Sequence, residues 1–522
     1  MARQASVIPT VYTETQTQEQ LREDIQAKGW WVSVPLTTFP VHWLYAGEQR
    51  LDGRYYANEA FTARHVIEDS RLEVKRLKDA VQDIFVLGRF KRIYARDPSA
   101  GWPYLSATEA LTFRPTSERW IARDHAPKDA DYHFAREGWI LLTCSGTVGR
   151  MVIASKRLEK FFLTHDLIRI VPSASMPKGY LYAFLSSWVG QVLLAKSKYG
   201  SAIKHLEPHH LASVPVPLLP WAEQETIHDE IMRAYALRDE ANDLLDKAEK
   251  QLYRDLGLTP FDPDQVRYMP PPPHGEPNLP TPPTLKAFTT LASELDERFD
   301  ASYHVPVAHA AVQQLRDGKY PIAPLASLAG DIHIPPRFKR IYVEKEYGVP
   351  FIQGSHLPQM KPQNIQYLSH SMTKGLHRWI IHRNWVLVTC SGTIGRISLT
   401  PSGWDGWAAT QHILRIIPDK EKGHPGYLAT FLATPYGQHQ LTAKIYGGVV
   451  DELTEADTAE VRVPDAPLGI QRAIGGQVVT AYEKKHEANA IEDAAIQHLE
   501  HLLEERAKAG RDEVEIRQPN LF

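Results

Sequence analysis

Two short segments hold the residues best suited to contact phosphate groups. The segment Arg89-Phe-Lys-Arg-Ile-Tyr94 contains three cations and two aromatic side chains, and the same residues recur at positions 337–342. Cations at this density suit the phosphates of a DNA backbone, and the rings suit stacking or packing beneath them. A basic strand edge that discourages aggregation would have a similar composition. Because the copies differ elsewhere but keep this cluster, we favour DNA contact. The candidate residues are Arg89, Lys91, Arg92, Tyr94, Arg337, Lys339, Arg340 and Tyr342.

A glycine-containing segment is also duplicated. It reads Ser145-Gly-Thr-Val-Gly-Arg150 in the first copy and Ser391-Gly-Thr-Ile-Gly-Arg396 in the second, and each follows a β-rich run. Glycines let the backbone approach a partner closely, and hydroxyl and guanidinium groups bind phosphate oxygens. A tight turn that needs positive φ is the alternative, and the two interpretations are compatible. The candidates here are Ser145, Thr147, Arg150, Ser391, Thr393 and Arg396.

Other positions differ between the copies in a way that suggests recognition of different targets. Residues 105–136 are rich in arginine, whereas residues 352–382 offer amides and histidine. Arginine favours guanine and glutamine favours adenine in the major groove. Lys204 and His205 are likewise replaced by acidic residues from Asp451 onward. Ordinary surface drift remains the alternative for any single position. The DNA-contact candidates from these segments are Arg114, Arg123, Lys204, His205, Gln353, His356 and Lys361.

Recognisable catalytic machinery is missing from the sequence. It contains no Gly-x-Gly, no phosphate-binding P-loop and no His-Glu-x-x-His. The histidines of residues 204–210 have near-metal spacing, but the second copy replaces them with acidic residues, which argues against a shared metal site. Cys144 and Cys390 precede the glycine segments and are expected to be buried core thiols. We therefore predict no catalytic residue, cofactor or metal on this chain.

Bulk composition sets the class of protein. The chain has 522 residues, 43% of them hydrophobic, and a formal net charge of −3. This length favours two or more domains, and two cysteines exclude a disulfide framework. The total charge does not exclude nucleic acid, because binding depends on where cations cluster. No apolar run approaches a membrane span and the N-terminus is polar, so we expect a cytoplasmic protein.

The elements that would position these residues form a tandem duplication. Each copy predicts a mixed α/β (α+β) module with strands near residues 138–144 and 166–172, or 384–390 and 412–418, and a helix from Tyr180 or Tyr427. A long helix with a narrow apolar stripe follows each module. The predicted boundaries are an N-terminal extension 1–50, modules 51–220 and 295–467, helices 221–257 and 468–508, a Pro-rich linker 258–294 and a tail 509–522.

Together these motifs resemble the specificity subunit of type I restriction–modification systems. The resemblance rests on the Thr-Cys-Ser-Gly-Thr-x-Gly-Arg segments, the Gly-Tyr-Leu helices, the closing Val-x-Val-Pro strands and the Trp221-Ala-Glu-Gln-Glu helix start. It implies two target-recognition domains that bind a bipartite double-stranded DNA site, and an antiparallel coiled coil formed by the long helices. It also implies docking of two DNA methyltransferase subunits, which would bind S-adenosylmethionine, and of a restriction subunit.

Two other classes of function stay open from the residues alone. A nuclease or other DNA enzyme could assemble its site from scattered residues, and a repeat protein could serve as a protein–protein scaffold. The chain also ends Gln518-Pro-Asn-Leu-Phe522, which resembles the peptide that docks on bacterial sliding clamps, although an inert tail is the simpler interpretation.

Overall fold

A computed structural model describes residues 59–196, 205–266, 268, 288–295, 298–447 and 450–517. The chain divides into two units, Met1–Thr62 and Ala63–Phe522, and the sheets of both modules lie in the second unit. The N-terminal extension, Lys204, most of the Pro-rich linker and the clamp-like tail at 518–522 lie outside the described residues.

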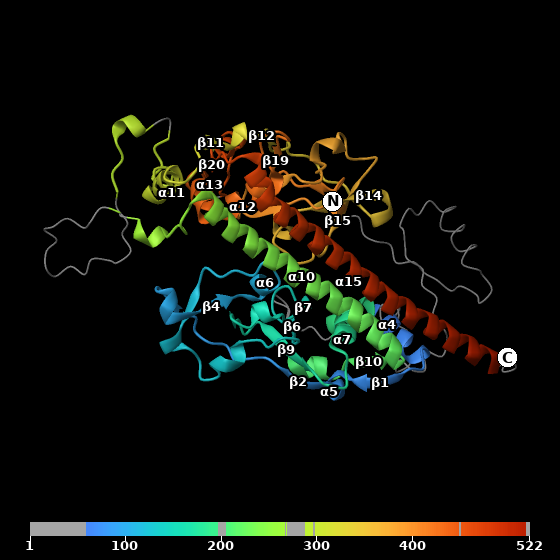
Figure 1. The fold of residues 1–522 in the computed structure, drawn as a ribbon. Coiled ribbons are helices and arrows are strands. Elements are labelled where there is room, and N and C mark those ends of the chain that lie inside the picture. The colour runs from blue at the N-terminus through green and yellow to red at the C-terminus, as the bar shows by residue number, and fades with distance from the viewer. Residues whose placement is uncertain are drawn as a thin grey trace, which may run out of the picture. The chain divides into compact units, whose positions relative to one another are not determined.

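Module 1 is built from three small sheets and short helices (Figure 1). One four-stranded sheet has the order β2 (Val81–Phe85), β9 (Leu167–Pro172), β6 (Ile140–Thr143), β7 (Met151–Ile153). The other has the order β3 (Tyr94–Ala95), β5 (Trp120–Ala122), β4 (Gly101–Leu105), β8 (Phe162–Leu163), and β1 (Glu73–Arg76) pairs with β10 (Pro215–Leu218). The helices are α4 (Glu59–Asp69), α5 (Leu77–Ala80), α6 (Ala107–Ala110), α7 (Lys178–Ser186), α8 (Trp188–Lys196) and α9 (Pro208–Ala212).

Module 2 repeats this topology strand for strand. Its sheets have the orders β12 (Ala329–His333), β19 (Ile413–Pro418), β16 (Val386–Thr389), β17 (Ile397–Leu399) and β13 (Tyr342–Val343), β15 (Gln366–Ser369), β14 (Gly348–Ile352), β18 (Ala408–Ala409). The remaining pair is β11 (Ile322–Pro324) with β20 (Arg462–Pro464), and the helices are α11 (Pro306–Arg316), α12 (Pro425–Ala433), α13 (Pro435–Ala443) and α14 (Glu455–Ala459). The predicted duplicated α/β fold is confirmed.

Each module is organised around one central strand pair. All four residues of β6 are buried, as are those of β16, so these runs of apolar residues lie within the core. In both modules the antiparallel neighbour of this strand contains a fully buried arginine, Arg169 opposite Leu141 and Arg415 opposite Leu387. The helices α7 and α12 begin close to Tyr180 and Tyr427, as the sequence predicts.

Two long helices join the modules. Helix α10 spans Trp221–Leu256 and helix α15 spans Leu468–Arg517, past the end predicted at residue 508. The apolar stripe predicted for α10 is completely buried, and so are Ala481, Ala488 and Ala495 of α15. Small residues at this seven-residue spacing allow the two backbones to approach closely.

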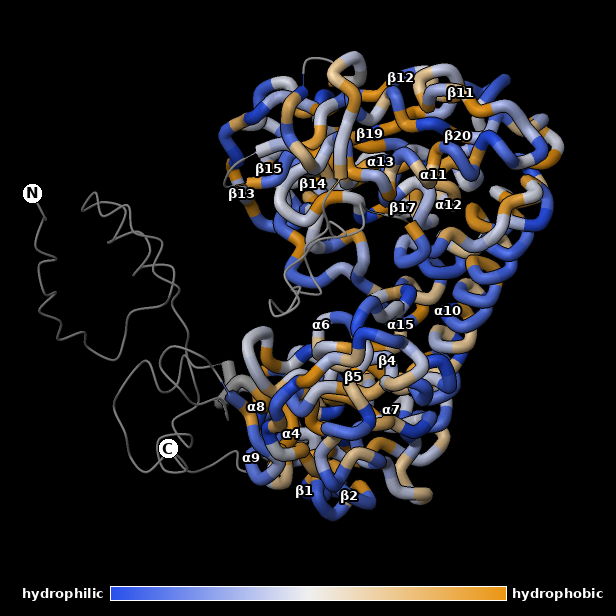
Figure 2. The backbone as a smooth tube through the Cα atoms, turned by 90° about the vertical axis from the view of Figure 1, so that its left-hand side faces the viewer, coloured by the Kyte–Doolittle hydropathy of each residue, from blue (hydrophilic) through white to orange (hydrophobic). Residues whose placement is uncertain are grey.

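The long helices are antiparallel. Early in α10, Glu223 pairs with Arg506 near the end of α15, whereas Gln251 near the end of α10 meets Gln477 early in α15. Figures 1 and 2 show the two helices running side by side between the modules. The predicted antiparallel pair is confirmed. Within the described part of the chain, no helix is both long and apolar enough to cross a membrane.

The far end of each long helix packs on the other copy. Just past α10, which ends at Gly257 in the left-handed conformation, the carbonyl of Thr259 accepts a hydrogen bond from Tyr436 of module 2. On α15, Glu500 accepts a hydrogen bond from the backbone N–H of Trp188 in module 1 (2.7 Å). Each helix therefore connects its own module to the other one.

The modules also meet directly, at equivalent positions. Thr112 and Gln359 lie the same number of residues after β4 and β14, and they form an antiparallel bridge. The flanking bonds run from Phe113 N to the Pro358 carbonyl (2.8 Å) and from Met360 N to the Leu111 carbonyl (3.2 Å). Exchanging the modules converts one bond into the other, so the bridge marks an approximate two-fold axis.

Candidate nucleic-acid interface

In module 1, the first basic cluster and three other loop segments lie together. We call residues 89–92, 145–147, 165–166 and 205 loop face 1. The Arg92 guanidinium lies 3.1 Å from the Asp166 carboxylate and 3.2 Å from the Thr164 hydroxyl. The Phe90 ring packs against His165, and Ser145 forms a β-bridge with His205. The predicted residues Arg89, Lys91 and Tyr94 are exposed on or beside this surface.

In module 2, the equivalent segments gather in the same way. Loop face 2 consists of residues 337–340, 391–393, 411–412 and 452. Arg340 donates to the Thr410 hydroxyl and to the Gln411 side-chain carbonyl, both at 3.2 Å. Arg337 lies 3.6 Å from Glu452, which bridges to Ser391. Arg337, Lys339 and Tyr342 are exposed. Both basic clusters thus lie next to a glycine turn.

The glycine turns have the backbone that the sequence suggested. Gly146 and Gly149 have φ of 71° and 99°, and Gly392 and Gly395 have 74° and 84°. Side chains seldom adopt these angles, which explains the glycines. Thr143 and Thr389 accept hydrogen bonds from the backbone N–H groups of Arg150 and Arg396, at 3.0 Å in both modules. The turns are therefore rigid, and they hold Ser145, Thr147, Ser391 and Thr393 beside the basic clusters.

The cysteines that precede these turns are buried. Cys144 is 7% exposed and Cys390 is 3% exposed. Burial raises the pKa of Cys144 to about 11 and that of Cys390 to about 12. Thiols with such pKa values stay protonated at neutral pH and are poor nucleophiles. They belong to the core beneath the turns.

Sequence reasoning missed the buried arginines and the dipeptides that they hold. The Arg169 guanidinium donates to the carbonyls of Thr164 (3.2 Å) and Leu167 (2.6 Å), and Arg415 donates to those of Thr410 (2.9 Å) and Ile413. Desolvation lowers the pKa of Arg169 to about 10 and that of Arg415 to about 9. The enclosed residues are His165-Asp166 in one module and Gln411-His412 in the other.

Several residues expected to contact DNA form ion pairs within the protein. Arg114 forms ion pairs with Asp246 (2.9 Å) and Glu249 (2.6 Å) of α10. Lys361 does the same with Glu492 (3.0 Å) and Asp493 (2.5 Å) of α15. These two cations join each module to its own long helix, and their contact with bases stays a prediction.

The other divergent candidates also make internal contacts. His356 is 7% exposed, and its ring nitrogen accepts from the Gln353 backbone N–H at 3.1 Å. Arg123 donates to the Gly101 carbonyl at 3.1 Å. Sequence spacing did not reveal these contacts because their partners lie far away along the chain or in backbone groups.

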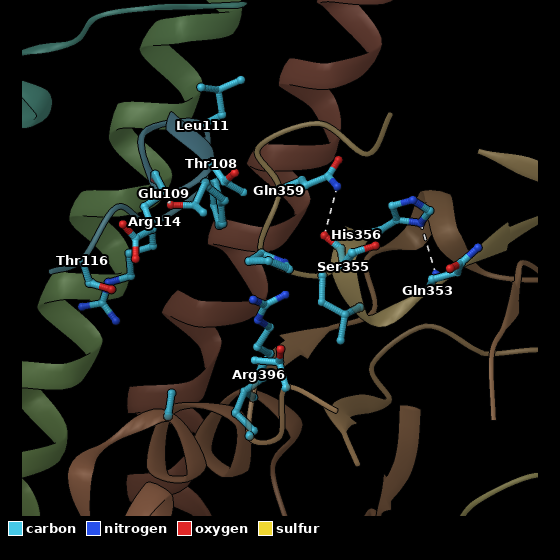
Figure 3. A pocket seen from close by; sticks show the side chains of 18 of the residues that line it. Thr108, Glu109, Leu111, Arg114, Thr116, Gln353, Ser355, His356, Gln359 and Arg396 are labelled. Carbon is cyan, nitrogen blue, oxygen red and sulfur yellow. Dashed lines mark hydrogen bonds between the residues drawn. The ribbon is translucent and has the colours of Figure 1, made fainter. Parts of the chain in front are cut away.

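A large cavity of about 1420 Å³ opens between the modules. Its wall includes Arg396 from one glycine turn, Arg114 beside α10, and Gln353, His356 and Gln359 from the segment after β14 (Figure 3). Thr147 and Thr393 of the two turns also line it. A second cavity of only about 30 Å³ is lined by Arg150, Tyr182, Lys361 and Glu492. Arg150 lines both cavities, and its equivalent Arg396 lines the large one.

Comparison with known proteins finds a family model that matches part of the chain. The family model described as "Type I restriction modification DNA specificity domain" matches residues 82–245, which include module 1 from β2 onward and two thirds of α10. Module 2 and α15 repeat that architecture element by element. Residues 82–245 therefore carry a type I restriction–modification DNA specificity domain. Specificity subunits of such systems recognise DNA and are not themselves catalytic.

Solved structures give weak matches to this chain. A type I restriction–modification S subunit from M. genitalium shares 11% identity, with 84% of this chain and 96% of that chain covered and a TM-score of 0.34. The HsdS subunit from Thermoanaerobacter tengcongensis shares 14% identity, with 84% and 96% covered and a TM-score of 0.25. The search of curated protein sequences found no match to the chain.

Proposed function

We propose that the two loop faces contact the two halves of a bipartite DNA target, one face to each half-site. The observation that supports this most is the retention of the basic cluster beside a glycine turn in both modules, on either side of one approximate two-fold axis. Exposed cations such as Lys91, Arg337 and Lys339 would bind backbone phosphates. The rigid turns would add hydroxyl and backbone N–H donors.

The long helices would set the distance between the half-sites. Helix α10 has 36 residues, and about 1.5 Å of rise per residue makes it longer than one turn of DNA, roughly 34 Å. The exposed sides of α10 and α15 would dock two methyltransferase subunits, which would hold S-adenosylmethionine and the catalytic residues. A restriction subunit would join the same complex. We place this assembly in the cytoplasm, where its DNA lies.

Methylation-sensitive sequencing of DNA modified by the subunit with its partner methyltransferase tests this proposal. An asymmetric motif with two defined halves and an undefined spacer is the expected result. Absence of any bipartite methylated motif, with the complex purified intact, would refute the proposed function.

A second experiment tests the loop faces. Replacing Lys91 by alanine removes one phosphate contact, so binding to all sequences weakens and its dependence on salt becomes less steep by about one counterion. Lys78 is an exposed lysine on α5, outside the loop faces, and Lys78→Ala serves as the matched control. Equal salt slopes in the Lys91→Ala variant and in the control would contradict phosphate contact by loop face 1.

A further inference from the structure

The loop faces share one rigid frame. Thr164 and Thr410 open the turns before β9 and β19, and the fully buried Arg169 and Arg415 bind the carbonyls of those threonines. Two residues further along, the carbonyls of Asp166 and His412 accept hydrogen bonds from the backbone N–H groups of Cys144 (3.1 Å) and Cys390 (3.0 Å), directly before the glycine segments. The backbone at residues 165–166 and 411–412 is therefore held in the same way in both modules.

Within this frame the side chains differ. His165 and Asp166 of module 1 become Gln411 and His412 in module 2, and His205 becomes Glu452. The neighbouring basic clusters are identical in the two modules. All six residues at these positions are partly exposed. The loop faces therefore combine a constant basic cluster with three variable positions.

The carboxylate of each face lies near a different arginine of the cluster. In module 1 Asp166 pairs with Arg92, and the structure gives Arg89 no ion pair with any described residue. In module 2 the position of Asp166 is taken by His412. Among the residues that the structure describes, the side-chain hydrogen bonds of Arg340 go to the neutral Thr410 and Gln411. There the carboxylate is Glu452, and it lies 3.6 Å from Arg337, the equivalent of Arg89.

We propose that these three variable positions specify the bases of each half-site by selecting which arginine of the constant cluster is available. An arginine without a carboxylate partner can present both nitrogens of its fork to guanine, whereas one paired to a carboxylate is held and partly neutralised. Arg89 is the available arginine of module 1, and Arg340 is that of module 2. Asp166, Gln411 and Glu452 add their own acceptors or amide to neighbouring base edges. This inference rests on the proposed function, because it assumes that the loop faces contact DNA.

Exchange of the variable positions tests the inference in the assembled methyltransferase complex. One variant combines His165→Gln, Asp166→His and His205→Glu, and the reciprocal variant combines Gln411→His, His412→Asp and Glu452→His. Selection from a randomised duplex library measures base preference at every position of both half-sites. Each variant is expected to change preference roughly ten-fold at one or more positions of its own half-site, the size of one bidentate contact, and to leave the other half-site unchanged.

Two isosteric variants cover the case in which an exchange variant fails to fold or bind. Asp166→Asn removes the charge beside Arg92, and Gln411→Glu adds one beside Arg340, with little change in shape. Asp166→Asn should relax the preference of half-site 1 only, and Gln411→Glu should alter half-site 2 only. Lys91→Gln is the matched control, because loss of a phosphate contact lowers affinity for every sequence equally.

The outcomes separate this inference from the proposed function. Variants that bind with the wild-type preference, or that change both half-sites together, would overturn the inference while the bipartite target itself stands. A wild-type complex without a bipartite target would instead refute the proposed function.

Discussion

Two junctions between the modules are related by the approximate two-fold axis, but they are packed differently. In the first junction the segment after β14 of module 2 meets module 1, and in the second the segment after β4 of module 1 meets module 2. At the first junction Tyr182, Arg238, Lys361 and Glu492 fill the space and leave a cavity of about 30 Å³. At the second, the equivalent positions hold Ala429, Lys485, Arg114 and Leu245. Ala429, Arg114 and Leu245 line the cavity of about 1420 Å³, which extends to Arg150 and Gln359 of the first junction. The same backbone plan thus supports one packed junction and one hollow junction.

The filled junction depends on a single buried carboxylate. Glu492 lies 2.7 Å from Arg238 and 3.0 Å from Lys361, and accepts from the Tyr182 hydroxyl at 3.3 Å. Burial alone would raise the pKa of Glu492, but Arg238 and Lys361 hold it below its usual value. In the hollow junction Leu245 replaces this carboxylate, so Lys485 is buried without a counter-ion among the described residues and packs 4.5 Å from the Phe113 ring. Symmetry of the backbone therefore does not extend to charge.

Removal of the carboxylate should have the largest effect. Glu492→Leu copies the hollow junction and leaves Arg238 buried without a counter-ion, so the free energy of unfolding should fall by about 3–5 kcal/mol. Denaturant unfolding of the purified subunit, with hydrogen exchange along α15, measures this. The double variant Arg238→Met/Glu492→Leu is the control and should recover most of the loss. A loss below about 1 kcal/mol in the single variant would show that the buried pair is not needed.

Removal of the Tyr182 ring should have the next largest effect on stability. Tyr182 is 5% exposed, and Tyr182→Ala should lower the free energy of unfolding by about 3 kcal/mol because it opens a cavity in the filled junction. Ala429→Tyr places the same ring in the hollow junction, where there is room, and should change stability by less than about 1 kcal/mol. Calorimetric melting of both variants compares them. Equal losses of stability in Tyr182→Ala and Ala429→Tyr would mean that the two junctions respond alike to a change in side-chain volume.

The pH dependence of stability should report the lysine of the hollow junction. Desolvation lowers the pKa of Lys485 to about 7, with Arg238 adding to the shift. Between pH 7 and the ordinary lysine pKa near 10.5 the unfolded chain binds this proton and the folded chain does not, so this lysine makes stability rise with pH.

Within that window the contribution approaches about 1.4 kcal/mol per pH unit. Comparison of wild type with Lys485→Met from pH 7 to 10 isolates it, and the variant should show the shallower slope. Parallel slopes for the two proteins would mean that Lys485 stays charged in the folded state.

The smallest effects are expected at the cations that join modules to helices. Arg114→Met and Lys361→Met should each lower the free energy of unfolding by about 1 kcal/mol, because both side chains keep some solvent contact. Lys361→Met should cost more, since its partner Glu492 is buried. Base preference should stay unchanged in both variants, which library selection measures. A shift in preference would restore these residues as recognition candidates.

The sequence predicted the helices, strands and turns that are repeated, but it did not predict the contacts that distant residues make with one another. Period and composition located the long helices, the central strands and the glycine turns, because these depend on local residue patterns. Arg114 and Lys361 looked like recognition residues because they differ inside a shared frame, yet their partners lie on helices more than a hundred residues away. His165 and Asp166 showed the same divergence within the same alignment. The ion pair of Asp166 with Arg92 and the contact of His165 with Phe90 show that they belong to the basic surface.

The two-fold axis at the Thr112–Gln359 bridge has a consequence for the polarity of the target. Duplex DNA has two-fold axes of its own, so a protein with such an axis meets the two strands in equivalent ways. Each module would then follow its half-site in the same 5′-to-3′ sense, but on opposite strands. Asymmetry of the target would come from side chains alone, and a subunit with identical loop faces would prefer an inverted repeat.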